Sequence, residues 1–169
     1  MTRPLILLDI DGCLNRLGGP APGFQAYKCM LSGRTVNVLL NPGHGPKLLE
    51  LADETGAELV WATAWTYDAN KTVGPLLALP ELPVIDVHLT PEDEPPGGTW
   101  KLPAVAAFVN RRPFVWFDDD LTVLDSRWLA DHPNVGPFQA IVTDEMRGIT
   151  DDDIAEAAEW LHSLREVDA

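Results

Sequence analysis

Short, mostly apolar runs recur along the chain, and they predict the strands of a buried sheet. The runs cover residues 4–8, 58–62, 84–87, 114–117 and 139–142. Apolar runs of this length, bounded by polar residues, are typical of strands that are covered on both faces. We therefore expect five parallel strands.

Helical patterns separate these runs. Apolar residues recur at helical spacing over 48–52, 102–109 and 154–164, and a Gly-Pro step interrupts a further helical stretch over 68–79. Strands that alternate with helices form α/β folds in which helices cover the faces of the sheet. The sequence thus predicts a three-layer, Rossmann-like α/β sandwich with a five-stranded parallel sheet, folded as a single domain over residues 1–169.

The segment from about residue 14 to residue 40 interrupts this alternation. It opens with a loop rich in Gly and Pro, and two short runs, 25–31 and 35–40, then flank the sequence Ser32-Gly33-Arg34. Two such runs around a Gly-containing turn predict a β-hairpin. The segment is too small for a full cap domain, so we interpret it as a flap, or minimal cap, that follows the first strand.

The composition is that of an ordinary globular protein, with 46% hydrophobic and 22% charged residues. No run approaches the ~18 apolar residues that a membrane span requires, and the first run stops at Asp9, too early for a secretory signal. Cys13 and Cys29 form no CxxC pair and no disulfide framework. We expect a cytoplasmic protein that does not contact membranes.

The chain is acidic, with a formal net charge of −14. Tight, sequence-independent binding of nucleic acid depends on Lys and Arg at the phosphates. We therefore expect no strong binding of this kind, although a small basic patch is compatible with the composition.

Polar side chains suited to phosphoryl chemistry stand at the ends of the predicted strands and at the start of one helix. They are Asp9, Asp11, Thr63, Lys101 and the three consecutive acids Asp118, Asp119 and Asp120. In parallel sheets, ligands bind at the carboxyl ends of the strands. These residues are therefore expected to gather at one edge of the sheet.

Asp9 and Asp11 lie two residues apart on an extended segment, so both carboxylates can approach one ligand. Two carboxylates at such a short distance repel each other unless a cation or a shared proton offsets their negative charge. Mg²⁺ is usually held by one or two carboxylates, waters and phosphate oxygens, and is the expected cofactor. The neighbouring acids oppose a thiolate at Cys13, which we interpret as a packing residue.

The order of these motifs resembles that of the haloacid dehalogenase-like (HAD) phosphohydrolases. In that superfamily a strand ends in DxD, another ends in Thr or Ser, a Lys begins a helix, and a further strand ends in an acidic pair. All four motifs appear here in that order, from Asp9 to Asp119. The chain is most similar to the small, cap-less members found in RNA-repair proteins.

The resemblance implies a role for each motif residue. Asp9 would be the nucleophile that forms an aspartyl-phosphate, and Asp11 the general acid and then the general base. Thr63 would bind a phosphoryl oxygen, and Lys101 would neutralise charge on the phosphate and on Asp9. Trp65 and Trp100 lie beside these residues, and we interpret them as packing residues rather than as stacking platforms for a base.

The resemblance also implies a metal site formed by Asp9, the backbone carbonyl of Asp11, and an acid of the later triplet. We favour Asp118 as that ligand because it directly follows the apolar run. Asp119 is the nearest substitute, and Asp120 can simply cap the next element. Three consecutive acids leave this register open.

These inferences favour a magnesium-dependent phosphomonoester hydrolase. An uncapped site admits a bulky substrate, such as a nucleotide or a phosphorylated polynucleotide end, and equally a small molecule covered by a partner subunit. Two alternatives remain: a phosphotransferase with the same motifs, and a non-catalytic binding or regulatory protein that keeps the fold.

Overall fold

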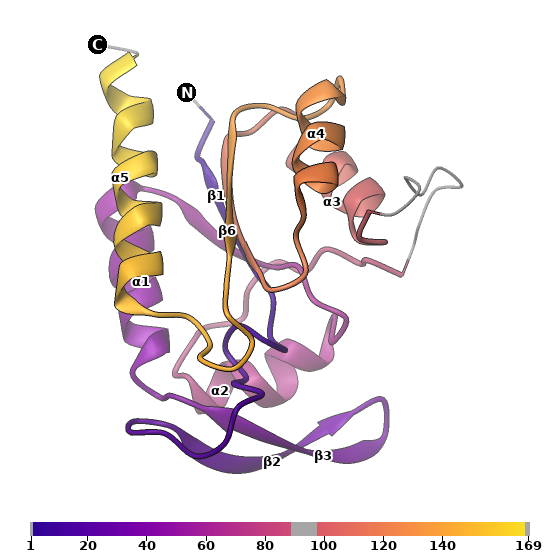
Figure 1. The fold of residues 1–169 in the computed structure, drawn as a ribbon, viewed down its shortest axis with the longest axis vertical. Helices are drawn as coiled ribbons and strands as arrows, with labels where there is room; N and C mark the ends of the chain where they lie inside the picture. Colours follow the sequence, from indigo (N-terminus) through magenta and orange to yellow (C-terminus); the bar gives the residue numbers. More distant parts are fainter. Residues whose placement is uncertain (1, 89–97, 168–169) are drawn as a thin grey trace.

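The computed structural model describes residues 2–88 and 98–167. In chain order, the elements are β1 (Leu5–Leu8), β2 (Gln25–Leu31), β3 (Arg34–Leu40), α1 (His44–Thr55), β4 (Glu58–Trp61), the π-helix η1 (Ala69–Val73), α2 (Gly74–Leu76), α3 (Leu102–Val109), β5 (Phe114–Asp118), α4 (Val123–Asp131), β6 (Phe138–Val142) and α5 (Asp151–Val167) (Figure 1). Within the two described ranges, no helix combines the length and the apolar character that a membrane crossing requires.

The predicted parallel α/β fold is confirmed. Its sheet has four strands in the order β4-β1-β5-β6, and all neighbouring pairs are parallel. This order places β1 and β5, the strands that carry the first and last acidic motifs, side by side at its centre. Leu8 at the end of β1 lies opposite both Trp61 of β4 and Phe117 of β5.

Of the five predicted strands, the one over 84–87 is reduced to one isolated bridge between Val84 and Trp61. The reason lies at the end of β4. The carbonyl of Thr63 accepts a hydrogen bond from the amide of Thr66, 3.0 Å away, so the chain turns instead of extending the ladder. The sheet therefore has four strands, with the bridge at its β4 edge.

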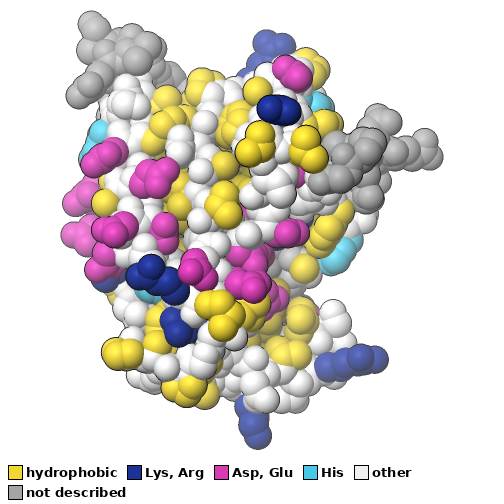
Figure 2. All heavy atoms as spheres, viewed as in Figure 1, with side chains coloured by type: hydrophobic (Ala, Val, Ile, Leu, Met, Phe, Trp, Pro, Cys, Tyr) yellow, Lys and Arg dark blue, Asp and Glu magenta, His cyan; other side chains and the backbone are white. Residues whose placement is uncertain are grey.

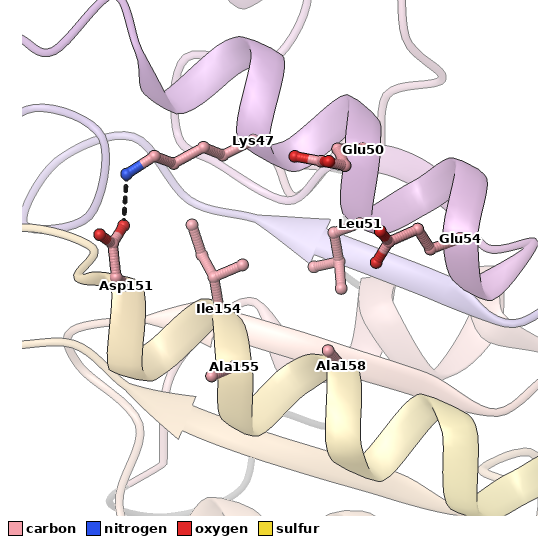
Figure 3. A pocket seen from close by; sticks show the side chains of 8 residues that line it. All are labelled: Lys47, Glu50, Leu51, Glu54, Asp151, Ile154, Ala155 and Ala158. Atoms are coloured by element: carbon pink, nitrogen blue, oxygen red, sulfur yellow. Dashed lines mark hydrogen bonds and ion pairs between the residues drawn. The ribbon is translucent and has the colours of Figure 1, made fainter.

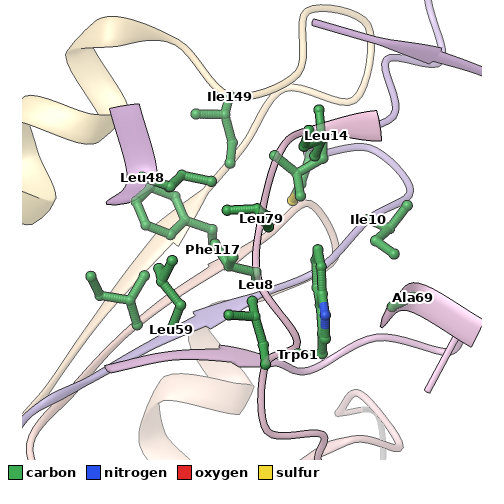
Figure 4. Close-up of a cluster of buried hydrophobic side chains, with 14 of the residues drawn as sticks. Leu8, Ile10, Leu14, Leu48, Leu59, Trp61, Ala69, Leu79, Phe117 and Ile149 are labelled. Carbon is green, nitrogen blue, oxygen red and sulfur yellow. The ribbon is translucent and has the colours of Figure 1, made fainter. Parts of the chain in front are cut away.

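The sheet is covered on both faces, and β1 shows how. Its even-numbered side chains, Ile6 and Leu8, belong to a hydrophobic cluster formed with α1, α5 and the hairpin, part of which appears in Figure 4. Its odd-numbered side chains, Leu5 and Leu7, pack in a second cluster with α3 and α4. Burial of each such side chain stabilises the fold by roughly 1.5–3 kcal/mol. Packing on both faces therefore fixes the position of the carboxyl end of β1.

Strands β2 and β3 form the predicted antiparallel hairpin, with Cys29 opposite Val36. Ser32 and Gly33 at its turn have φ angles of 49° and 76°, the left-handed values typical of two-residue hairpin turns. The hairpin lies across the end of the sheet at which β1 finishes (Figure 1). Its inward side chains join the core cluster beneath α1 and α5.

Helix α4 was not predicted. It begins with a capping box, in which the Thr122 hydroxyl accepts from the amide of Asp125 and the Asp125 carboxylate accepts from the amide of Thr122. This Thr-x-x-Asp signature is readable in the sequence. It was obscured by the three consecutive acids that precede it.

Candidate active site

Asp9, Lys101 and Asp118 meet at the carboxyl edge of the sheet. Because Leu8 and Phe117 are register partners, Asp9 and Asp118 emerge together from the two central strands. The ammonium nitrogen of Lys101 lies 2.9 Å from Asp9 Oδ2 and 2.7 Å from Asp118 Oδ2. All three side chains are buried. The sequence prediction that these distant motifs converge therefore agrees with the geometry.

This cluster holds two carboxylates and one ammonium group. Burial raises the pKa of Asp9 to about 7, with Asp118 adding to the effect and Lys101 opposing it. Burial by itself would lower the pKa of Lys101, but the carboxylates of Asp9 and Asp118 outweigh it and raise that pKa instead. Lys101 therefore stays charged, and ionised Asp9 requires further positive charge nearby.

Asp11 is held by two donors from different parts of the chain. Its Oδ1 accepts from Asn15 Nδ2 at 2.7 Å, and its Oδ2 accepts from the indole Nε1 of Trp65 at 2.9 Å. The Oδ1 of Asn15 in turn accepts from the amide of Leu39 in β3, at 2.9 Å. Asp11 is thus connected to the hairpin on one side and to the turn after β4 on the other.

Trp65 is buried, as a packing residue would be, but its indole N–H also makes this specific contact with Asp11. Sequence reasoning missed the role of Trp65 as a hydrogen-bond donor to Asp11. Its position two residues after Thr63 was the only signal available.

Thr63 is fully buried in the turn after β4, where its hydroxyl oxygen accepts from the amide of Trp65 at 3.3 Å. Within the described part of the chain, the Thr63 side chain makes no hydrogen bond to Asp9, Asp11 or Lys101. Trp65 links the two motifs, because its amide binds Thr63 and its indole binds Asp11.

The three consecutive acids that begin at the last residue of β5 have different surroundings. Both oxygens of Asp118 are engaged, Oδ2 by Lys101 and Oδ1 by the amide of Asp120 at 3.0 Å. The Asp119 carboxylate instead packs over Gly12, where a Cβ atom would lie 2.2 Å from Asp119 Oδ2. Gly12 also has a φ of 76°. Both the lack of space for a Cβ atom and the left-handed backbone therefore require glycine at this position. The Asp120 side chain is exposed.

Asp9, Cys13 and Asp119 are grouped closely enough to hold a metal ion, with one potential ligand atom from each lying within 4.8 Å of the others. Burial, and next the Asp9 carboxylate, raise the pKa of Cys13 well above its usual range, so the sulfur is a neutral thiol. Its Sγ lies 2.9 Å from the hydroxyl of Thr143. Two carboxylates beside a neutral thiol form a donor set that suits a hard, oxygen-preferring cation.

The backbone leading into Lys101 is anchored by Asp125. The carboxylate of Asp125 is almost fully buried, and its Oδ1 accepts from the amide of Thr99 at 2.6 Å. Its Oδ2 accepts from the amide and the hydroxyl of Thr122, each at 2.6 Å. Asp125 therefore joins the start of α4 to the turn that carries Lys101. Sequence reasoning missed this contact because it missed α4.

The parallel sheet, the carboxylates at the ends of its two central strands, and the lysine between them are the features of a HAD-like domain. The comparison with protein families identifies the family within the HAD superfamily. The family described as "HAD domain in Swiss Army Knife RNA repair proteins" matches residues 5–154, so the chain belongs to this family. The comparisons with curated proteins and with solved structures gave no match. The matched range contains all four motifs, and the resemblance seen in the sequence is confirmed.

Proposed function

We propose that the protein is a magnesium-dependent phosphomonoester hydrolase that acts through an aspartyl-phosphate on Asp9. The observation that carries this proposal is the position of the Lys101 ammonium between Asp9 and Asp118 at the carboxyl edge of the sheet. A fixed positive charge beside a carboxylate nucleophile stabilises the negative charge that gathers on a transferring phosphoryl group. Membership of a HAD family supports the same chemistry.

In the first step, a carboxylate oxygen of Asp9 attacks phosphorus and the ester P–O bond breaks. Asp11 donates its proton to the departing alcohol oxygen. In the second step, Asp11 accepts a proton from water, whose oxygen attacks the phosphorus of the aspartyl-phosphate. The bond to Asp9 then breaks and releases inorganic phosphate. Thr63 and Lys101 bind the phosphoryl oxygens in both steps.

Asp9, the backbone carbonyl of Asp11, and Asp119 would hold the magnesium ion. Bound Mg²⁺ would supply the positive charge that keeps Asp9 ionised and that screens it from the incoming phosphate. We favour Asp119 over Asp118 as the ligand from the triplet, because Asp119 has a carboxylate oxygen grouped with Asp9 and Cys13, whereas Asp118 contacts Lys101. Asp118 then serves to position Lys101.

This assignment can be tested with three isosteric replacements. Asp119→Asn should weaken Mg²⁺ binding by at least about tenfold, since metal-ligand and supporting substitutions typically cost 10–100-fold in affinity. Asp120→Asn, at an exposed carboxylate, is the control and should leave binding unchanged. Mn²⁺ binding followed by electron paramagnetic resonance gives the affinities. A larger loss in Asp118→Asn than in Asp119→Asn would restore Asp118 as the direct ligand.

The proposed substrate is a phosphorylated polynucleotide end. The family name refers to RNA repair, and among the described residues the only cover near the site is the β2–β3 hairpin, which we propose as a flap. A panel of phosphomonoesters, including nucleotides and 3′- or 5′-phosphorylated oligonucleotides, tests the proposal with and without Mg²⁺. Transfer of phosphate to an added alcohol would instead identify a phosphotransferase. Inactivity on the whole panel would favour a non-catalytic protein.

Asp125 offers a prediction with an internal control. Its capping box is duplicated at α5, where the Asp153 carboxylate accepts from the amide and hydroxyl of Thr150 at 2.7 and 2.8 Å. Each Asp→Ala change removes one helix cap and should cost about 1 kcal/mol of stability. Only Asp125→Ala also releases Thr99 and so displaces Lys101. We expect at least a tenfold loss of kcat/KM, as a displacement of about 1 Å can cost 10²-fold.

For Asp153→Ala we expect little change in kcat/KM. Comparable melting temperatures in the two variants would show that lost folding stability is not the cause of any difference in activity. Equal kcat/KM values in Asp125→Ala and Asp153→Ala would show that Asp125 is only a helix cap.

A further inference from the structure

The charges of this acidic chain are unevenly distributed. Residues 12–49 contain none of its twenty-six Asp and Glu residues but four of its twelve Lys and Arg residues: Arg16, Lys28, Arg34 and Lys47. Lys47 pairs with Asp151. Across the described residues, no ion pair involves the other three. Figure 2 shows Lys and Arg side chains projecting at the end of the molecule where Figure 1 places β2 and β3, whereas acids gather over α5.

The two hairpin cations lie on an exposed path. Cys29 and Val38 point inward and are buried, whereas Lys28 and Arg34 are exposed. Lys28 pairs with Asn37 across the hairpin, and Arg34 pairs with Leu31. The two cations are therefore three positions apart along the hairpin, or roughly 10 Å at ~3.3 Å per residue. Because side chains alternate between the two faces, Lys28 lies on the face of Asn37, whereas Arg34 lies beside the turn on the face of Leu31.

A shallow groove of about 300 Å³ connects this path to the candidate site. Asn15, Arg16 and Asn37 are among its lining residues, and none of these lining residues is acidic. Asn15 donates to the Asp11 carboxylate, and Asn37 stands opposite Lys28. The groove thus begins beside the proposed general acid and ends beside the first hairpin cation.

A second groove, between α1 and α5, has the opposite character. Glu50, Glu54 and Asp151 line it, and its one cation, Lys47, is paired with Asp151 (Figure 3). This groove would repel a polyanion. The contrast singles out the hairpin side of the molecule for an anionic partner.

We propose that the β2–β3 hairpin, from Lys28 beside the groove to Arg34 beside the turn, binds the phosphodiester backbone of a polynucleotide strand whose terminal phosphate lies in the candidate site. The inference rests on the proposed function. It adds the surface along which the strand beyond the terminal phosphate binds. Cations spaced along a path match a ligand with repeated anions. A mononucleotide or phosphopeptide would place its phosphate at Asp9 and leave Lys28 and Arg34 unused. The Asp68 carboxylate, which accepts from the amide of Ser32 at the hairpin turn, is paired with Lys71. Acids farther away are screened, because the Debye length is about 8 Å at physiological ionic strength.

The test compares a 3′- or 5′-phosphorylated oligonucleotide with the corresponding mononucleotide and with p-nitrophenyl phosphate. The variant is Lys28→Glu/Arg34→Glu. The control is Arg111→Glu/Arg127→Glu, which changes the net charge equally at exposed positions on the side of the molecule that carries α3 and α4. In the hairpin variant, KM for the oligonucleotide should rise about tenfold and the salt dependence of log(kcat/KM) should fall by about one unit per lost phosphate contact.

Activity of the hairpin variant on the mononucleotide and on p-nitrophenyl phosphate should stay within about twofold of the wild type. An equal loss for all three substrates, or an equal loss in the control variant, would overturn the proposed docking surface. If the wild type hydrolyses none of the substrates, the proposed function fails. Fluorescence anisotropy with a labelled oligonucleotide then still tests the surface, and unchanged affinity in Lys28→Glu/Arg34→Glu would overturn it.

Discussion

Replacing Asp9 by asparagine should lower kcat by at least about 10⁴-fold, as loss of a covalent nucleophile does in other hydrolases. The amide has nearly the shape of the carboxylate but cannot attack phosphorus. Phosphate release from the best substrate of the panel, measured at saturating Mg²⁺, gives the comparison. Asp120→Asn removes a carboxylate from an exposed position at the same edge and should keep wild-type turnover. Substantial turnover by Asp9→Asn would remove Asp9 from the role of nucleophile.

The same variant should show an altered dependence of stability on pH when metal is removed by a chelator. Burial raises the pKa of Asp9 from 3.8 to about 7. The folded state therefore binds this proton more tightly than the unfolded state, and the associated stability is complete below about pH 3.8 and is lost as the pH rises through 7. Asparagine has no proton to lose. The melting temperature of Asp9→Asn relative to the wild type should thus rise with pH, by several degrees between pH 5 and pH 8.

The second large effect is expected for Lys101→Ala. The change leaves Asp9 and Asp118 buried and facing each other without their shared cation. Breaking a buried ion pair by removing one partner typically costs 3–5 kcal/mol, because the remaining charge is uncompensated. Catalysis should also fall, by about 10²–10³-fold in kcat, since a fixed donor to the transferring phosphoryl group is lost. Urea unfolding and steady-state kinetics measure the two effects.

Lys47→Ala is the control for Lys101→Ala, because it removes a lysine from an ion pair at the surface. Lys47 pairs with Asp151, but both side chains are largely exposed, at 46% and 77%. Exposed ion pairs contribute little to stability, so this variant should unfold and react much as the wild type does. If Lys101→Ala were as stable and as active as Lys47→Ala, the buried cluster would have neither the structural nor the catalytic importance assigned to it.

Much of the fold was readable because β1, β4 and β5 have strong local signals. Their apolar runs end at polar residues, and the polar residues of a parallel sheet must emerge at one edge. That rule alone predicted that Asp9 and Asp118 would meet, and the register of β1 and β5 brings them to the same lysine. The hairpin was readable for a similar reason, because its turn needs left-handed residues such as Gly33.

The features that sequence reasoning missed depend on contacts between distant segments. The apolar run at 84–87 resembles a strand, but whether it pairs is decided by the turn at Thr63 and Thr66. Apolar runs do not show whether Asp118 or Asp119 faces Asp9, because that depends on the packing of Asp119 over Gly12. The indole donor to Asp11, Trp65, lies 54 residues further along the chain, so no local spacing rule finds it.

A covalent phosphoryl group on Asp9 is the central feature of the proposed mechanism. Asp11→Asn lacks the base for the second step, and p-nitrophenyl phosphate needs no general acid for the first because p-nitrophenolate is a good leaving group. This variant should accumulate the intermediate when mixed with p-nitrophenyl phosphate and Mg²⁺ and then quenched in acid. Mass spectrometry of the digested protein should find the mass of one phosphoryl group on the peptide that contains Asp9, and none in Asp9→Asn/Asp11→Asn. An active wild-type enzyme whose Asp9 peptide is never modified, or a label located elsewhere, would contradict the mechanism.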